Sequence, residues 1–230
     1  MRPDQEFTLE VRTTAVAAAA PILLVPFVLI AALVAGSYQP LHDFDRRVTD
    51  RMHEVAVGHP GWADAMAWWS LIFHPTTWRI AAALLMVWLW RRHARPLAIW
   101  VGATMAAGAL LGVLLKLLFG RHRPDLLDPV AQAAGYAFPS GHALTNALGA
   151  AVFLMVLLPL VRDRLLARAG LWFAALVIPL VTAFTRVALG VHWASDVVAG
   201  LLFGVALAAL TAWAFVYRVR PRRVRESVPG

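Results

Sequence analysis

The residues best suited to chemistry lie near the start of the last apolar segment. His192 and Asp196 are four residues apart, a spacing that places an imidazole and a carboxylate on one face of a helix. If the carboxylate accepts the hydrogen bond of one ring nitrogen, the other nitrogen is left unprotonated and aimed at an electrophile. A purely structural His–Asp hydrogen bond has the same spacing, so the pair alone does not establish a site.

Three cations in this part of the chain suit the binding of a phosphate. Arg186 lies six residues before His192, and Lys116 and Arg123-Pro124 lie upstream. The guanidinium groups of Arg123 and Arg186 match phosphate oxygens in bidentate geometry, and Lys116 adds a compact point charge. Lys116 stands in an apolar stretch, where an unpartnered charge is costly, although its side chain can also extend to the membrane surface from a helix end.

A third polar group is the tetrapeptide Pro139-Ser140-Gly141-His142. It precedes an apolar segment, so free backbone N–H groups and the positive end of a helix dipole should face an anion there. Gly141 lets the main chain approach closely, and His142 can donate a proton to a leaving oxygen. A plain turn with Ser140 as the helix N-cap is the alternative. Together, the three groups predict the binding and attack of a phosphate.

The composition indicates an integral membrane protein. Of the 230 residues, 60% are hydrophobic, and the mean hydropathy is +0.67. Several apolar runs approach the length needed to cross a hydrocarbon core. The net charge of +8 resides mainly in short clusters at the ends of these runs, which favours membrane orientation over nucleic-acid binding. With no cysteine, the chain has no disulfides or thiolate metal sites.

We expect an all-α bundle of six transmembrane helices forming a single domain over residues 1–230. The first apolar run is too long for the core of a secretion signal and is interpreted as an anchor. Segment 38–70 is charged and rich in tryptophan, and is interpreted as a short interfacial element. The expected spans are about 14–36, 71–90, 97–119, 142–160, 170–189 and 193–217.

The distribution of basic residues predicts the orientation. With six spans, both termini share one side with the loops near 91–96 and 161–169, and these four regions hold thirteen of the 21 Lys and Arg residues. The positive-inside rule then makes the termini cytoplasmic and places all three polar groups at the outer face of a cell membrane. The expected partners are the bilayer and a lipid phosphate; no obligate protein partner is indicated.

These motifs resemble those of the type 2 phosphatidic acid phosphatases, membrane lipid phosphatases that share an active-site arrangement with vanadium haloperoxidases. The family's Lys-x6-Arg-Pro motif matches residues 116–124, and Pro-Ser-Gly-His matches residues 139–142. The third motif, usually Ser-Arg-x5-His-x3-Asp, matches residues 185–196 with Thr185 in place of serine. The resemblance implies hydrolysis of undecaprenyl diphosphate, phosphatidylglycerol phosphate or phosphatidic acid, without a metal or other cofactor.

The resemblance also implies a role for each motif residue. His192 would be the nucleophile that forms a phosphohistidine, Asp196 would orient it, and His142 would be the general acid. The phosphoryl oxygens would be held by Lys116, Arg123, Ser140, Gly141 and Arg186.

Other residues and functions remain open at this stage. Arg121, His122 and Thr185 are possible accessory residues, with Arg121 a candidate for a second substrate phosphate; His42, His53, His59, His74 and His93 are assigned to the surface or interface. The pairs Gly108/Gly112 and Gly200/Gly204 suggest close helix packing within the chain. A transporter or flippase would need the cations without the nucleophile and acid, and a purely structural protein would leave Lys116 unexplained.

Overall fold

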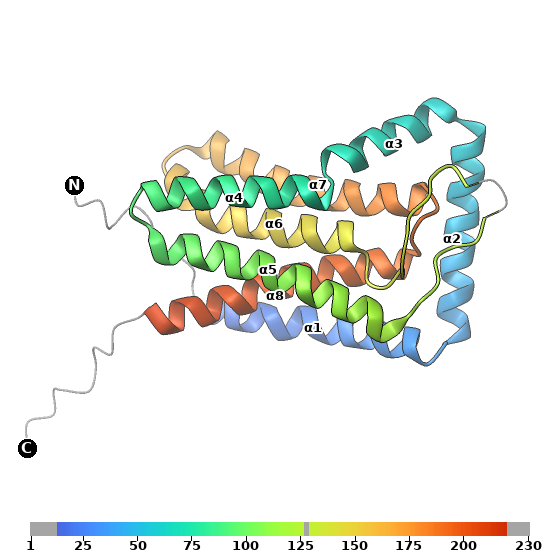
Figure 1. Ribbon diagram of the computed structural model, residues 1–230, viewed down its shortest axis with the longest axis horizontal. Helices are drawn as coiled ribbons and strands as arrows, with labels where there is room; N and C mark the ends of the chain where they lie inside the picture. The colour runs from blue at the N-terminus through green and yellow to red at the C-terminus, as the bar shows by residue number, and fades with distance from the viewer. Residues whose placement is uncertain (1–12, 127–128, 220–230) are drawn as a thin grey trace, which may run out of the picture.

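The computed structural model describes residues 13–126 and 129–219, and in these ranges the regular structure is helical. Most of the long helices run roughly parallel and form a bundle, which α2 crosses at one end (Figure 1). The elements are α1 (Thr13–Ala35), α2 (Gln39–Gly58), α3 (Pro60–Ile72), α4 (Pro75–Arg91), α5 (Arg95–Phe119), α6 (Gly141–Leu157), the 3-10 helix η2 (Leu158–Val161), α7 (Leu165–Ala188) and α8 (Ala194–Val219).

The helices agree with the predicted multi-pass helical architecture. By length and apolar composition, five described segments can cross a membrane, and a sixth is obtained if α1 and α2 count as one span bent by 96°. The predicted spans 97–119, 142–160, 170–189 and 193–217 correspond to α5, α6 with η2, α7 and α8. The all-α bundle predicted from the sequence is therefore confirmed.

Segment 38–70 differs from its prediction. Instead of one short interfacial element, it forms α2 and most of α3, and Asp45 on α2 is fully buried. The second predicted span also begins differently, because α3 and α4 form one candidate membrane segment that is interrupted at Phe73 and His74. The interruption has a local cause, since His74 caps α4 and Pro75 occupies its first turn.

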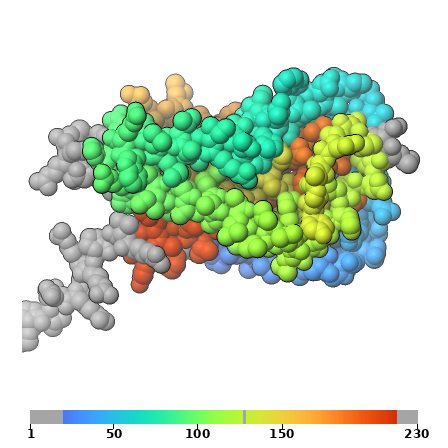
Figure 2. All heavy atoms as spheres, in the orientation of Figure 1, coloured from blue at the N-terminus to red at the C-terminus, as the bar shows by residue number. Residues whose placement is uncertain are grey.

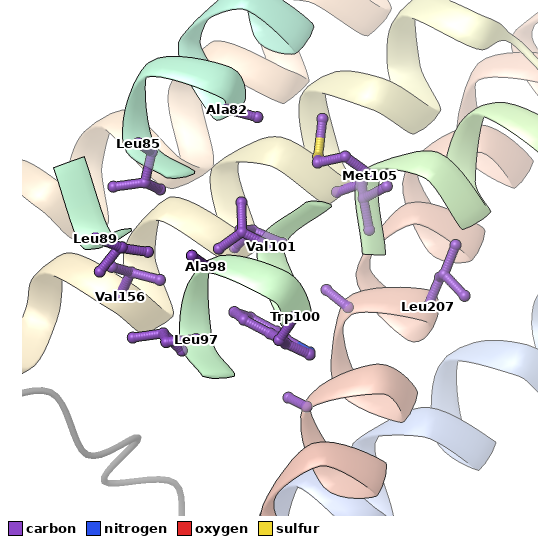
Figure 3. Close-up of a cluster of buried hydrophobic side chains, with 14 of the residues drawn as sticks. Ala82, Leu85, Leu89, Leu97, Ala98, Trp100, Val101, Met105, Val156 and Leu207 are labelled. Atoms are coloured by element: carbon purple, nitrogen blue, oxygen red, sulfur yellow. The ribbon is translucent and has the colours of Figure 1, made fainter. Parts of the chain in front are cut away.

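An apolar core joins the helices that carry the motifs. Its largest cluster lies among α4, α5, α6 and α8, and Figure 3 shows Leu89, Val101 and Leu207 directed into it. Leu89 and Val101 are completely buried. This core fixes the parallel arrangement of the helices whose ends carry the polar residues.

Close packing of α8 on α6 depends on two glycines. A Cβ built on Gly204 would lie 2.5 Å from the Leu144 carbonyl oxygen, and one on Gly200 would lie 2.7 Å from that of Ser140. Since both obstacles are backbone atoms, larger side chains would force the helices apart. The glycine pair therefore packs within the chain, as expected from the sequence.

We predict that Gly204→Val destabilises the protein by about 1–3 kcal/mol, because the added atoms overpack the α6–α8 contact. Gly170→Val on α7 is the matched control, since a Cβ at Gly170 meets nothing within 4 Å. The measurement is reversible unfolding in detergent micelles. Equal stability losses in the two variants would contradict this account of the helix contact.

Candidate active site

Six of the predicted site residues line one cavity at the end of the bundle crossed by α2. The cavity has a volume of about 480 Å³ and lies between α3 and the connection from α5 to α6. Figure 2 shows this connection arching over the end of the bundle, with a hollow beside α3. The predicted residues in its lining are Lys116, Arg123, Gly141, His142, Arg186 and His192.

The end of α5 positions the first two cations. Gly120 caps the helix in the left-handed conformation, with φ +57°, and its N–H donates to the Lys116 carbonyl. The chain then turns, so that Lys116 in the last turn and Arg123 beyond the cap both reach the cavity. The Lys116 ammonium donates to the Tyr136 carbonyl at 2.6 Å, which anchors it to the connecting segment.

Arg123 is held by backbone carbonyl groups. Its Nε donates to the Gly135 carbonyl at 2.8 Å, and one terminal nitrogen donates to the Val191 carbonyl at 2.6 Å. The same terminal nitrogen lies 3.1 Å from Nε2 of His192. Because a guanidinium can only donate, this Nε2 carries the lone pair and the ring proton lies on Nδ1.

Asp196 stabilises the tautomer of His192 that carries the proton on Nδ1. Nδ1 of His192 lies 3.3 Å from Oδ2 of Asp196, which also accepts the Trp193 backbone N–H at 3.0 Å. Burial lowers the pKa of His192 to about 4, although the hydrogen bond and charge of Asp196 oppose this shift. The imidazole is therefore neutral near pH 7, and its unprotonated nitrogen lies beside Arg123.

Arg186 also lines the cavity. It is 8% exposed, and one of its terminal nitrogens donates to Ser70 Oγ on α3. Its Nε is buried and has no hydrogen-bond partner among the described residues. A buried guanidinium with unused donors at a cavity wall is suited to an anionic ligand.

The start of α6 also contributes to the cavity lining. The helix begins at Gly141, and Ser140 is its N-cap, with the hydroxyl accepting the Ala143 N–H at 3.5 Å. The Ser140 N–H donates to the Asp196 carbonyl at 3.0 Å, which joins the second motif to the third. His142 follows in the first turn and lines the cavity.

The three accessory residues do not line the cavity. Thr185 is fully buried, and its hydroxyl donates to the Thr182 carbonyl at 2.7 Å. His122 is exposed, and its carbonyl accepts the Trp193 indole N–H. Ser140 and Asp196 are also absent from the cavity lining. The Asp196 carboxylate contacts His192, which faces the cavity, and Ser140 caps the helix that carries His142.

Arg121 belongs to a buried ionic network behind the site. Its guanidinium donates to Oδ1 of Asp196 at 2.6 Å, to Oδ2 of Asp45 at 2.7 Å and to Ser195 Oγ at 2.7 Å. Asp45 also accepts the Ser195 N–H at 2.9 Å. These contacts occupy Arg121 away from the cavity, so the structure gives it a supporting position instead of the predicted contact with a second phosphate.

Among the described residues, no group of three or more His, Cys, Asp or Glu side chains is placed to hold a metal ion. The described cavity lining instead carries three cations and three imidazoles: Lys116, Arg123, Arg186, His74, His142 and His192.

The comparison with known families agrees with this geometry. The PAP2 superfamily profile matches residues 97–220, more than half of the chain, including all three motifs. The chain belongs to the PAP2 superfamily. The matched segment contains α5 to α8, whereas Asp45, Ser70 and His74 precede it.

Relatives of the chain have names that refer to different lipids. The chain is 28% identical to an undecaprenyl-diphosphatase of Sulfolobus acidocaldarius, over 55% of this chain and 58% of the relative. It is 36% identical to a lipid A 1-phosphatase of Rhizobium johnstonii, over 50% of this chain and 48% of the relative. These matches span about half the length of each relative.

A solved structure shares the PAP2 fold. The crystal structure of a transmembrane PAP2 type phosphatidylglycerolphosphate phosphatase from Bacillus subtilis superposes with a TM-score of 0.77 and 21% identity. The alignment covers 90% of this chain and 98% of that one. The similarity therefore extends beyond the segment matched by the family profile.

Several polar residues at or beside the site were not predicted from the sequence. His74 lines the cavity beside His142, Ser70 binds Arg186, and buried Asn146 donates to the His142 carbonyl at 2.9 Å. From the sequence, His74 is expected at the surface or interface, whereas the His-Pro pair at 74–75 indicates a helix start and so places His74 at a helix end. No local pattern marks Ser70 or Asn146.

We predict that Asp45→Ala lowers the free energy of unfolding by about 3 kcal/mol, because it leaves the buried Ser195 N–H and a terminal nitrogen of Arg121 without their acceptor. Asp43→Ala is the matched control on the same helix, since Asp43 is exposed. Its expected effect is within about 0.5 kcal/mol. Thermal unfolding in detergent compares the two, and equal melting temperatures would refute the role of the network in stability.

Proposed function

We propose that this PAP2 protein is a lipid phosphatase that works through a phosphohistidine on His192. The observation that carries the proposal is the position of the lone pair on His192 Nε2 at a cavity wall, beside Arg123 and backed by Asp196. A transporter of anionic lipids would use the cations but has no need for an oriented nucleophile. The family membership supports the same choice.

In the first step, Nε2 of His192 attacks phosphorus while the bond to the leaving oxygen breaks. Lys116, Arg123 and Arg186 bind the phosphoryl oxygens and stabilise the charge that spreads over them in the transition state. Arg123 turns from Nε2 to the phosphate when the substrate binds. His142 donates a proton to the leaving oxygen, and Asp196 stabilises the positive charge that develops on His192.

In the second step, water attacks the phosphohistidine. His142, now unprotonated, accepts a proton from this water, and the P–N bond breaks. The products are inorganic phosphate and neutral His192. The proposed reaction uses no metal, and the cations of the lining would repel a divalent ion while offering it few oxygen ligands.

The substrate class proposed is a phosphate or diphosphate monoester of a membrane lipid. The named relatives act on undecaprenyl diphosphate and on lipid A, which differ in their tails but share an anionic phosphate on a lipid. We propose undecaprenyl diphosphate, phosphatidylglycerol phosphate and phosphatidic acid as candidates. Purified protein assayed against these lipids in EDTA tests both the activity and its independence of metal.

Replacement of His192 should separate the enzyme from a non-catalytic binder. We predict that His192→Ala abolishes phosphate release and phosphoenzyme together, because no other nucleophile is proposed. Quenching a reaction of radiolabelled substrate in alkaline detergent measures the intermediate, which should be base-stable and acid-labile. Label that persists in His192→Ala would disprove the assignment.

His142→Ala should have a different signature. We predict a loss of about 10²–10⁴-fold for a lipid alkyl phosphate, whose leaving oxygen needs a proton. The loss should be smaller for p-nitrophenyl phosphate, whose leaving group is acidic. Phosphoenzyme should still form in this variant, and an equal loss for both substrates would contradict its role as general acid.

We also propose that the protein is a multi-pass protein of a cell membrane whose site faces outward. The described arginines of the loops that join α4 to α5 and α6 to α7 lie at the end of the bundle opposite α2 (Figure 1), and the positive-inside rule makes that end cytoplasmic. Arg2, Arg12, Arg220, Arg222, Arg223 and Arg225 of the predicted cytoplasmic clusters lie outside the described residues.

Cysteine labelling tests this orientation in a chain that contains no cysteine of its own. We predict that Val130→Cys, in the exposed connection over the site, reacts with an impermeant maleimide in intact cells. Asp163→Cys, between η2 and α7, should react only after permeabilisation. The reverse pattern would place the site in the cytoplasm.

A further inference from the structure

His74 is a cavity residue that the proposed mechanism does not use. It precedes α4, lies outside the three motifs and outside the segment matched by the family profile, and lines the same cavity as His142. The two rings meet edge to face, with centroids 5.0 Å apart and an angle of 81° between their planes. A second imidazole is therefore adjacent to the general acid of the proposed mechanism.

Hydrogen bonding determines which ring nitrogen of His74 is a donor. As the N-cap of α4, the side chain accepts the Thr76 N–H on Nδ1 at 3.2 Å. A backbone N–H only donates, so Nδ1 carries the lone pair and the proton of the neutral ring lies on Nε2. Nδ1 of His74 is therefore occupied as the acceptor of the helix cap, whereas its Nε2–H remains as a donor for a ligand.

Asn146 fixes His74 relative to His142. Its amide nitrogen donates to the Phe73 carbonyl at 2.8 Å and to the His142 carbonyl at 2.9 Å, so one side chain joins the residue before His74 to His142 itself. The amide oxygen accepts the Trp78 indole N–H at 2.7 Å, which settles the orientation of the amide. The break between α3 and α4 is thereby held against the first turn of α6.

The geometry of in-line displacement determines which part of the substrate would lie next to His74. The attacking and leaving atoms lie on opposite sides of phosphorus, so with His192 as the nucleophile the leaving group departs on the side of His142. For a lipid monophosphate, the first atoms there are a bridging oxygen and the apolar tail. For a lipid diphosphate, a second phosphoryl group follows the bridging oxygen, and its oxygens accept hydrogen bonds.

Resting on the proposed function, we infer that His74 is a specificity-determining residue whose Nε2–H binds the second phosphoryl group of a lipid diphosphate. His192 forms a bond to the terminal phosphorus, and the bond from that phosphorus to the bridging oxygen breaks. The electron pair stays on the bridging oxygen, so the leaving group is the lipid monophosphate, which receives a proton from His142 and a hydrogen bond from His74. Water then releases inorganic phosphate from His192. The substrate class favoured by this wall is the lipid diphosphate.

Two substitutions separate the capping role of His74 from ligand binding. His74→Asn keeps an acceptor near the position of Nδ1 and so preserves the cap, but it removes the distal N–H donor. His74→Gln extends an amide N–H toward the position of Nε2 but lacks the short capping acceptor. The test compares kcat/KM for farnesyl diphosphate and farnesyl phosphate, which share one tail.

We predict that His74→Asn lowers the diphosphate-to-monophosphate ratio of kcat/KM by about 10- to 100-fold, the value of a hydrogen bond to a charged group. His74→Gln should retain more of the ratio despite a lower melting temperature. An unchanged ratio in His74→Asn would overturn the inference, as would an equal fall in both variants.

Binding provides a readout that does not depend on turnover. Pyrophosphate should raise the melting temperature of the wild-type protein more than inorganic phosphate at the same concentration, and His74→Asn should lose this difference. If the wild type hydrolyses neither lipid but shows this His74-dependent preference, the proposed phosphatase activity fails and the diphosphate site stands. Equal stabilisation by the two anions in the wild type would refute the site.

Discussion

The buried ion pairs of Arg121 are the interaction on which the rest of the site depends. This one guanidinium joins Asp45 on α2 to Asp196 on α8, at 2.7 and 2.6 Å. One cation and two carboxylates leave a single negative charge, which lies against the Nδ1 side of His192. Removal of Arg121 would leave two buried carboxylates without a counter-charge, at a cost of several kcal/mol. Removal of Asp45 would leave the buried Ser195 N–H and a terminal nitrogen of Arg121 without their acceptor. The network thus couples the helix across the bundle end to the orientation of the imidazole.

A second feature of the site is that its cations are anchored by groups that do not neutralise their charge. Backbone carbonyl groups of Tyr136, Gly135 and Val191 anchor Lys116 and Arg123, so these side chains are fixed while their charge remains available. A carboxylate partner would have fixed them equally well but would have competed with an anionic ligand. Among the described side chains, the only carboxylate that contacts His192 is that of Asp196, which is also paired with the Arg121 guanidinium.

Close helix packing brings the motifs together. The absence of side chains at Gly200 and Gly204 lets α8 approach the backbone of α6, and Ser140 can then donate its N–H to the Asp196 carbonyl. This contact sets the start of α6, with His142, against the start of α8. Asn146, one turn after His142, binds the Phe73 carbonyl and so also holds the break before α4 against α6. Small residues in the bundle therefore have a direct effect on the geometry of the cavity.

The membrane class, the helical bundle and the candidate residues could be predicted from the sequence alone, because apolar run length and short spacings are local properties. His192 and Asp196 illustrate this, since their four-residue spacing already implies contact. The burial of Arg121 could not be predicted from the sequence, because it depends on distant Asp45 and Ser195. His74 likewise became a cavity residue only because Asn146 holds Phe73 beside α6. The tertiary structure decided these positions, since their partners lie many residues apart and no local pattern encodes which will meet.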